Sequence, residues 1–270
     1  MIDPADARQL DALLRRHRIT LQHRLGQNFL IDPDIRDRVA DAAAATREDV
    51  VVEVGAGVGT LTVALASRAK RVVAVELDRA LLPALREVVR DVSNIEVVEG
   101  DILKVDVTAE VIAGNIPYNL TGALIRRFLD RQPRPRRMSL VVQKEVAERW
   151  TDPTAASLAT VAVQVYTEPR LLLTIAAKAF TPQPKVDSAL VVLDVRPEPA
   201  VHVEDMDAFL RFVEAVFQFR RKQLGGALAR MGSSKMALSA AGIDPIRRPQ
   251  TLTLLEWENL FRAVNEESDR

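Results

Sequence analysis

The chain has 270 residues, of which 48% are hydrophobic and 27% are charged, so it can bury a substantial core. It has no cysteine, which excludes disulfides and thiolate metal sites, and its histidines (His17, His23 and His202) lack metal-ligand spacing. Lys and Arg number 37, and Asp and Glu also number 37, so net charge cannot drive binding to a polyanion. We expect no metal and only locally clustered basic surfaces.

The hydropathy of the chain gives no sign of membrane insertion. The first residues lack the basic and apolar regions of a signal peptide. No apolar run approaches the ~20 residues that a spanning helix needs. We expect a cytoplasmic protein that acts as a monomer and does not contact a membrane.

The N-terminal segment predicts two helices. Residues 4–17 form an amphipathic pattern, with Leu10, Leu13 and Leu14 on one side. Asp32 and Pro33 have the residue types of an N-cap and a first helical position. We expect a helical extension over residues 1–30.

The middle of the chain alternates apolar runs with helical stretches. The runs are rich in Val and Ile, which favours buried strands over Val50–Val54, Arg71–Glu76, Ile95–Glu99, Val111–Gly114 and Met138–Gln143. Helices are predicted over about 59–68, 79–90 and 120–130. This alternation predicts an α/β fold with a Rossmann-like, mostly parallel, seven-stranded sheet covered by helices.

The pattern changes in the last third of the chain. Ala189–Val195 is a late strand candidate, and residues 196–199 read as a linker. From Met206 onward the apolar spacing is helical. We expect one α/β domain over residues 1–199 and a small all-α domain over 200–270.

A glycine-rich loop joins the first strand to its helix. Gly55, Gly57 and Gly59 allow a tight turn and a close approach of a ligand to the backbone. A dehydrogenase fingerprint would need another glycine where Thr60 stands. Glu53, two residues before the first glycine, is more typical of methyltransferases and could orient the loop or the amino-acid end of S-adenosylmethionine.

Two further acidic residues follow the second and third strands. Glu76 is about 20 residues past the loop, where an acid can hold both hydroxyls of a ribose. Asp101 stands where a carboxylate can accept a hydrogen bond from an adenine amine. Because Gly55, Glu76 and Asp101 end successive strands of one predicted sheet, they are expected at a common ligand site.

The residues after the fourth strand suit methylation of an exocyclic amine. The oxygen of the Asn115 side chain and the carbonyl of Ile116 can each accept one N–H of an adenine amine, which aims the nitrogen lone pair at the methyl donor. Pro117 fixes the backbone, and Tyr118 can stack on the base. Phe180, in a loop held by two prolines, could form the opposite face of this pocket.

Basic residues cluster at several places along the chain. Arg220, Arg221 and Lys222 follow a Phe-rich predicted helix, and other clusters span 15–18 and 126–137. We expect these clusters to form an RNA-binding surface shared by the two domains. The alternative is that they are solvated helix ends, where basic residues favour the helix dipole.

Several segments together resemble the rRNA adenine N6,N6-dimethyltransferase family. The resemblance covers about residues 20–230, in the family's order, and rests on residues 25–32, 53–62, 75–78, 100–102, 114–119, 143–149 and 182–189. It implies a class I methyltransferase fold. It implies contacts to S-adenosylmethionine from Asn28, Leu30, Gly55, Glu76, Asp101 and Asn115. It also implies that residues 115–118 and Phe180 hold the target adenine.

The resemblance leaves more than one function open. One branch of the family dimethylates two adjacent adenines near the 3′ end of 16S rRNA, and the opening of residues 25–30, residues 219–222 and the helical tail resemble it. A second branch methylates 23S rRNA and gives macrolide resistance. A non-catalytic RNA- or DNA-binding relative is the alternative from another class, and a small-molecule methyltransferase or dehydrogenase is a weaker one.

Overall fold

The computed structural model describes residues 2–21, 27–117, 120–129, 132–154, 157–232 and 235–268. The chain divides into two compact units. Unit 1 consists of Met1–Glu148 and Glu168–Val195, and unit 2 consists of Arg149–Thr167 and Arg196–Arg270. Residues 149–167 therefore group with the C-terminal helices, whereas the sequence led us to expect all of residues 1–199 in one domain.

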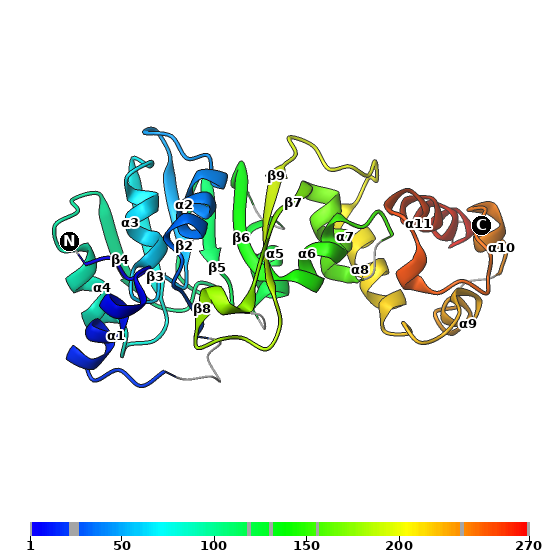
Figure 1. Cartoon of the computed structure of the whole chain (residues 1–270). Helices are drawn as coiled ribbons and strands as arrows, with labels where there is room; N and C mark the ends of the chain where they lie inside the picture. The colour runs from blue at the N-terminus through cyan, green and yellow to red at the C-terminus, as the bar shows by residue number, and fades with distance from the viewer. Residues whose placement is uncertain are drawn as a thin grey trace. The chain divides into compact units, whose positions relative to one another are not determined.

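Unit 1 is built on a seven-stranded sheet in the order β4-β3-β2-β5-β6-β9-β7 (Figure 1). The pairs β2–β3, β3–β4, β2–β5 and β5–β6 are parallel, and β6–β9 is antiparallel. The strands are β2 (Val50–Val54), β3 (Arg71–Glu76), β4 (Ile95–Glu99), β5 (Val111–Asn115), β6 (Arg137–Gln143), β7 (Thr167–Ile175) and β9 (Ser188–Val195). The predicted Rossmann-like, mostly parallel sheet is confirmed.

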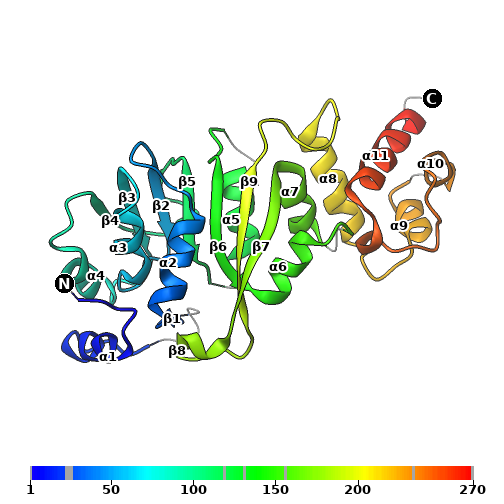
Figure 2. The same ribbon diagram turned by 45° about the horizontal axis from the view of Figure 1, so that its top comes forward.

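Helices cover both faces of this sheet because the strand order reverses between β2 and β5. Right-handed crossovers that run in opposite directions from this point place their helices on opposite faces. In Figure 2, α2 lies in front of the sheet and α5 behind it. The helices of this unit are α1 (Ala7–Arg16), α2 (Pro33–Ala42), α3 (Thr60–Ala66), α4 (Leu82–Val89) and α5 (Thr121–Leu129), and α6 (Lys144–Thr151) begins here.

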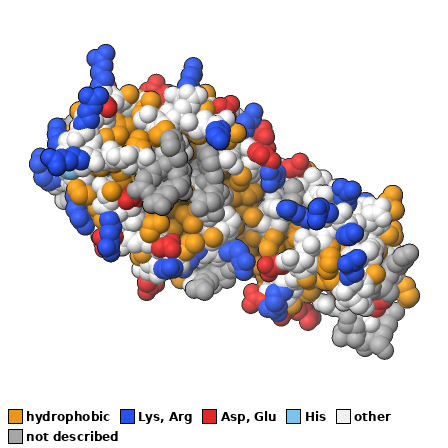
Figure 3. All heavy atoms as spheres, turned by 90° about the horizontal axis from the view of Figure 1, so that it is seen from below, with side chains coloured by type: hydrophobic (Ala, Val, Ile, Leu, Met, Phe, Trp, Pro, Cys, Tyr) orange, Lys and Arg blue, Asp and Glu red, His pale blue; other side chains and the backbone are white. Residues whose placement is uncertain are grey.

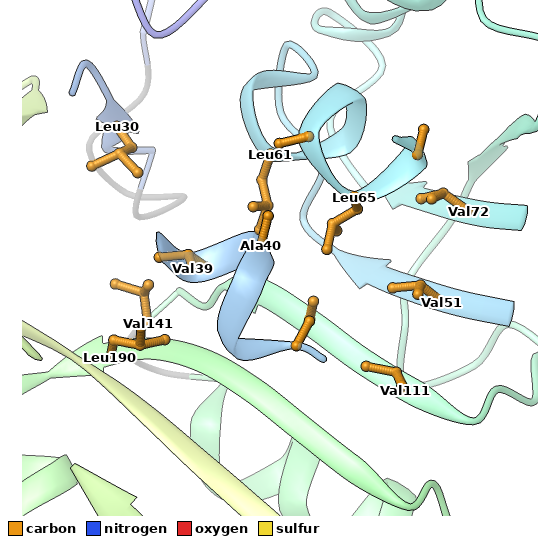
Figure 4. Close-up of a cluster of buried hydrophobic side chains, with 14 of the residues drawn as sticks. Leu30, Val39, Ala40, Val51, Leu61, Leu65, Val72, Val111, Val141 and Leu190 are labelled. Atoms are coloured by element: carbon orange, nitrogen blue, oxygen red, sulfur yellow. The ribbon is translucent and has the colours of Figure 1, made fainter. Parts of the chain in front are cut away.

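The main core lies between α2, α3 and one face of the sheet. Val39 of α2 and Leu61 and Leu65 of α3 point toward the apolar side chains of the strands (Figure 4). Val51 and Val111, from β2 and β5, are fully buried in this cluster. The predicted N-cap is confirmed, because the Asp32 carboxylate accepts a hydrogen bond from the Ile35 amide at 3.0 Å.

A second cluster fixes the N-terminal helix to α4. Leu10 and Leu13 of α1 are almost fully buried, and they cluster with Leu81, Leu85 and Phe29. The carboxylate of Glu87 on α4 pairs with Arg16 and, at 2.6 Å, with His17. The N-terminal extension is therefore packed against the main domain by both apolar and ionic contacts.

A short two-stranded sheet joins segments that are far apart in the sequence. Strand β1 (Phe29–Leu30) pairs antiparallel with β8 (Phe180–Thr181), so that Leu30 lies opposite Phe180. The turn before β8 is the 3-10 helix η2 (Ala177–Ala179), and the Ile31 amide donates to the Ala179 carbonyl at 2.8 Å. This pairing brings the residues before α2 to the loop that contains Phe180.

Unit 2 is helical, as predicted. Its elements are the end of α6, then α7 (Leu158–Tyr166), α8 (Met206–Phe217), α9 (Leu224–Arg230), α10 (Lys235–Ala240), the 3-10 helix η3 (Pro249–Thr251) and α11 (Leu254–Ser268). Helix α7 packs against α8 and α11, and aromatic rings of α8 stack on Trp257 and Phe261 of α11. Within the described part of the chain, every helix is too short or too polar to span a bilayer.

Candidate active site

A pocket opens at the carboxyl ends of β2, β3, β4 and β5. This is where the strand order of the sheet reverses, and open α/β sheets bind ligands at such a switch point. The cavity volume is about 180 Å³. Because a water needs roughly 10–15 Å³ by this measure, the cavity has room for a nucleoside-sized molecule.

The glycine loop forms the floor of this pocket. Gly55, Gly57 and Gly59 have positive φ angles of 70°, 61° and 92°, which side chains rarely adopt. A Cβ atom on Gly57 would lie 3.0 Å from the ring of Phe29, so the loop and β1 are in close contact. Both features explain why these positions need glycine.

The carboxylate of Glu76 closes the glycine loop at the end of β3. Its two oxygens accept hydrogen bonds from the amides of Gly57 and Asp78, both at 2.7 Å. The side chain is buried, and burial raises the pKa of Glu76. The carboxylate is thus rigidly held at the pocket, where the sequence predicted a ribose-binding acid.

Glu53 lies deeper in the same pocket. It stands on β2 between Ala74 of β3 and Ala113 of β5, and it is only 2% exposed. Its Oε2 atom has no hydrogen-bond partner among the described residues. Burial raises the pKa of Glu53 to about 8; the hydroxyl of Thr62 opposes this rise, and the charge of Glu76 adds to it.

Asp101 lies at the pocket's edge, after β4. One of its oxygens accepts a hydrogen bond from the Leu103 amide at 3.0 Å, which fixes the turn. The side chain is 29% exposed and Lys104 is 3.9 Å away. The second oxygen can therefore accept a hydrogen bond from a ligand.

The side chain of Asn115 is oriented by the main chain of the N-terminal segment. Its Nδ2 atom donates to the carbonyl of Asn28 at 2.8 Å, which leaves the Oδ1 atom as a free acceptor beside the pocket. The residue before it must be glycine, since a Cβ on Gly114 would lie 2.5 Å from the carbonyl oxygen of Val54. Ile116 is buried and its amide donates to the carbonyl of Val141 at 3.0 Å.

Phe180, Pro117 and Leu30 also line the pocket. Phe180 is 3% exposed and reaches the pocket through the pairing of β8 with β1. The structure thus brings the predicted residues Asn28, Leu30, Glu53, Gly55, Gly57, Glu76, Asp101, Asn115, Pro117 and Phe180 around one cavity. Tyr118 lies outside the described residues, so its predicted stacking role stays a prediction.

Sequence reasoning missed two residues of this site. Phe29 packs on the glycine loop, and Gln27 donates to the Asp78 carboxylate at 2.6 Å, which ties the N-terminal segment to the end of β3. Gln27 and Phe29 lie in the segment over 25–32 that carries the family resemblance, so their proximity to the pocket could have been suspected. Nothing local in the sequence indicates the contact with Asp78.

The predicted RNA-binding residues lie in unit 2, directly after α8. Arg220, Arg221 and Lys222 are exposed, and their side chains form no ion pair with any described residue. On the face drawn in Figure 3, basic side chains are interspersed with acidic ones rather than gathered in one block. The exposure of the three residues permits contact with a polyanion.

The charge of the pocket discriminates between cofactors. Its described lining contains no Lys, Arg or His, and its charged residues are Glu53, Glu76, Asp78 and Asp101. These acidic side chains would repel the pyrophosphate of a dinucleotide, whereas they would attract a cationic nucleoside derivative. Nor does any group of three or more His, Asp or Glu in the described ranges have an arrangement that could hold a metal ion. This pocket on this sheet defines a class I methyltransferase.

Comparison with known proteins identifies the family of methyltransferases to which the chain belongs. A model of the Ribosomal RNA adenine dimethylase family matches residues 18–267, and the chain belongs to this family. Ribosomal RNA small subunit methyltransferase A from Pelotomaculum thermopropionicum is 43% identical, over 96% of this chain and 97% of its own length. The protein of that name from Geobacillus thermodenitrificans is 37% identical, over 93% and 94% respectively.

Solved structures agree with this assignment. The 23S rRNA methyltransferase ErmE is 31% identical with a TM-score of 0.72, and the match covers 88% of this chain and all of that one (100%). A dimethyladenosine transferase from Plasmodium falciparum has a TM-score of 0.73 at 24% identity, over 88% and 97% of the two chains, which supports the fold alone.

Proposed function

We propose that this chain transfers methyl groups from S-adenosylmethionine to N6 of two adjacent adenines in the 3′-terminal hairpin loop of 16S rRNA, during small-subunit biogenesis. We propose that it acts as a cytoplasmic monomer on the small subunit or its precursor. Two near full-length relatives that are named Ribosomal RNA small subunit methyltransferase A support this substrate over 23S rRNA.

The observation that carries the catalytic proposal is the hydrogen bond from Asn115 to the carbonyl of Asn28. It uses one of the two N–H groups of the amide and fixes the orientation of the side chain, so the Oδ1 atom is available to accept a hydrogen bond from a substrate. A target adenine amine is a donor of two N–H bonds. The second N–H would be accepted by the carbonyl of Ile116, with the backbone fixed by Pro117.

The residues of the pocket fit S-adenosylmethionine, because the described lining contains no cationic side chain and the buried Oε2 atom of Glu53 has no hydrogen-bond partner among the described residues. Asp101 would accept from its adenine amine, Glu76 from its ribose hydroxyls, and Asn28, Leu30, Gly55 and Gly57 would supply main-chain and apolar contacts. When bound, this cofactor supplies a methyl group on an electrophilic sulfonium.

The chain's contribution to the reaction is orientation of the amine. The lone pair of an adenine amine is delocalised into the ring, so the amine must be drawn toward tetrahedral geometry before it attacks. Asn115 and Ile116 would hold both N–H bonds in that geometry, while Phe180 and Tyr118 hold the ring. No strong base is required at the nitrogen, since its proton can leave after the transfer.

Arg220, Arg221 and Lys222 would contact the phosphate backbone of the rRNA, as would basic residues over 15–18 and 126–137 other than Arg16, Arg136 and Arg137, which form ion pairs with acids of the chain. A chain with zero net charge can bind a polyanion only through such local clusters. These contacts would position the substrate without reading its sequence.

The test is a methylation reaction on small ribosomal subunits from a methylation-deficient strain, with labelled S-adenosylmethionine and mapping of the modified bases. We expect label on two adjacent adenines of the 3′-terminal hairpin of 16S rRNA. Label on 23S rRNA in a parallel reaction with large subunits would instead support the branch to which ErmE belongs by name. Binding of RNA without label on either would favour a non-catalytic relative.

A further inference from the structure

Phe219 differs from the other phenylalanines of unit 2. The phenylalanine rings of α8 stack on Trp257 and Phe261 of α11 and form the core of the unit. The ring of Phe219, in the turn between α8 and α9 (Figure 1), stacks on no other aromatic ring of the described residues and is partly exposed. Stacking within the core therefore does not explain an aromatic side chain at this position.

The side chain of Arg230 lies over this ring. Its guanidinium carbon is 6.0 Å from the centroid of the Phe219 ring, which is within the range of a cation–π contact. Arg230 is exposed and forms no ion pair with a described residue. A guanidinium is planar and weakly hydrated, so each of its two faces can stack on a π-system. Because one face lies on Phe219, the opposite face is open to a ligand.

The backbone of the turn holds Phe219 in place. Its amide donates to the carbonyl of Val216 at 3.0 Å, and its carbonyl accepts from the amide of Lys222 at 2.7 Å. These two bonds close successive tight turns at the end of α8. The ring is therefore presented by an ordered segment of the main chain.

Helix α9 presents Arg230 on its outer face. Leu224, Ala227 and Leu228 have the spacing of one helical face, and all three are fully buried. Gly226 lies one turn before Arg230 on the opposite, outer face. A Cβ atom at Gly226 would meet no atom within 4 Å, so the space beside the guanidinium is open. A flat group can therefore approach Arg230 without displacing a side chain of this turn.

The turn also carries the basic cluster that the sequence predicts to bind RNA. Arg220, Arg221 and Lys222 follow Phe219 directly, and all three are exposed. An RNA strand whose phosphates contact this cluster has its bases beside Phe219 and Arg230. A contact with the dipole of α9 would explain a cation at position 230, but a lysine would serve that purpose equally.

On the basis of the proposed function, we propose that Arg230, supported by Phe219, forms a stacking platform for one unpaired base of the rRNA. Unpaired RNA bases stack on guanidinium planes and on aromatic rings. Every base has a π-face, so the platform accepts any of the four bases. It belongs to unit 2 and is separate from the pocket of the target adenine, which residues of unit 1 line.

The test compares two labelled strands by fluorescence anisotropy with the full chain. One is a single-stranded RNA of about 12 nucleotides, within the usual site size for single strands, that contains no adenine, so that it does not probe the catalytic pocket. The other is an abasic strand with the same number of phosphates. We expect the wild type to bind the strand with bases more tightly by roughly fivefold or more.

Two conservative variants assign this preference. Arg230→Lys keeps the charge at the end of α9 and removes the planar group, whereas Phe219→Leu keeps an apolar side chain and removes the ring. Each should lose most of the preference for bases. Their affinity for the abasic strand and its salt dependence should match those of the wild type, because the phosphate contacts remain. Arg211→Lys, the same exchange at an exposed position on α8, should keep the preference of the wild type.

The outcomes separate this inference from the proposed function. An undiminished preference in Arg230→Lys would overturn the inference, as would an equal loss of affinity for both strands, which is the result expected of a purely electrostatic or structural contact. Arg230 is exposed, so this variant decides the question even if Phe219→Leu does not fold. A wild type that methylates small subunits but binds both strands equally would refute the platform alone. A wild type with the preference that leaves small subunits unmethylated would refute the proposed function alone.

Discussion

The buried carboxyl of Glu53 should make the stability of the ligand-free protein fall as the pH rises. Its pKa is raised from 4.5 to about 8 by burial. The folded state therefore holds a proton that the unfolded state has lost at every pH between these values. Stability falls with pH wherever the folded state binds more protons, so the loss begins above pH 4.5 and levels off above pH 8.

The size of this effect follows from the same two values. One proton changes the free energy of unfolding by about 1.4 kcal/mol per pH unit, so the rise from 4.5 to about 8 corresponds to roughly 5 kcal/mol. This is a ceiling, because water that enters the pocket would solvate the ionised form. In Glu53→Gln the pH-dependent loss disappears, and a buried amide that lacks a partner costs about 1–3 kcal/mol at all pH values.

Denaturant unfolding of the wild type and Glu53→Gln from pH 5 to pH 8.5, without ligand, tests this reasoning. Other groups titrate in both proteins and cancel in the difference. The wild type should lose up to about 4 kcal/mol relative to the variant between pH 5 and pH 8. Its difference from Glu48→Gln, a control at an exposed position, should stay constant. A constant difference between the wild type and Glu53→Gln would refute the assignment of a buried, protonated Glu53.

Three further substitutions test the proposed roles of other residues. Glu76→Ala removes an acceptor of the ribose hydroxyls, so calorimetry should show S-adenosylmethionine binding weakened by roughly 2–3 kcal/mol; unchanged affinity would contradict a ribose-binding role. Asn115→Ala should lose methyl transfer while folding and RNA binding remain, and a loss in turnover of less than about tenfold, or ~1.4 kcal/mol, would show that Asn115 does not orient the amine. The combined change of Arg220, Arg221 and Lys222 to Ala should lower RNA affinity and flatten its salt dependence with cofactor affinity unchanged; a lower melting temperature with intact RNA affinity would mean that the cluster only stabilises its helix.

Much of the sheet could be predicted because its central strands are rich in Val and largely buried. Val50–Val54 and Arg71–Glu76 have the predicted bounds, since strands buried on both faces stand out from their neighbours. The strand Thr167–Ile175 was not predicted, because its side chains alternate between exposed and partly buried and it contains Pro169 and Arg170. Helix α7 was missed because it is apolar all round and rich in Val, which resembles a buried strand.

The site was predictable to the extent that its residues end strands or stand in glycine loops. The positions of Glu76, Asp101 and Asn115 followed from the rule that parallel strands present their carboxyl ends at one edge. The contact of Asn115 with the Asn28 carbonyl was not predictable, since it joins positions 87 residues apart through a main-chain atom that carries no sequence signal. The lack of a hydrogen-bond donor for the Glu53 Oε2 atom was not predictable either, because it depends on the side chains of all the elements packed around it.

The grouping of residues 149–167 with the C-terminal helices has a consequence for synthesis on the ribosome. Helix α7 emerges before α8 and α11, and its fully buried Val161, Val163 and Val165 have no complete partner surface until α11 is made. Unit 1 is complete at Val195, whereas α11 ends at Ser268. Synthesis proceeds at about 5–20 residues per second, so roughly 5–20 s pass between the end of α7 at Tyr166 and the end of α11 at Ser268. A message that is truncated in the last helix would yield a chain with a finished sheet and an α7 that α8 covers only in part, which leaves apolar surface open to aggregation.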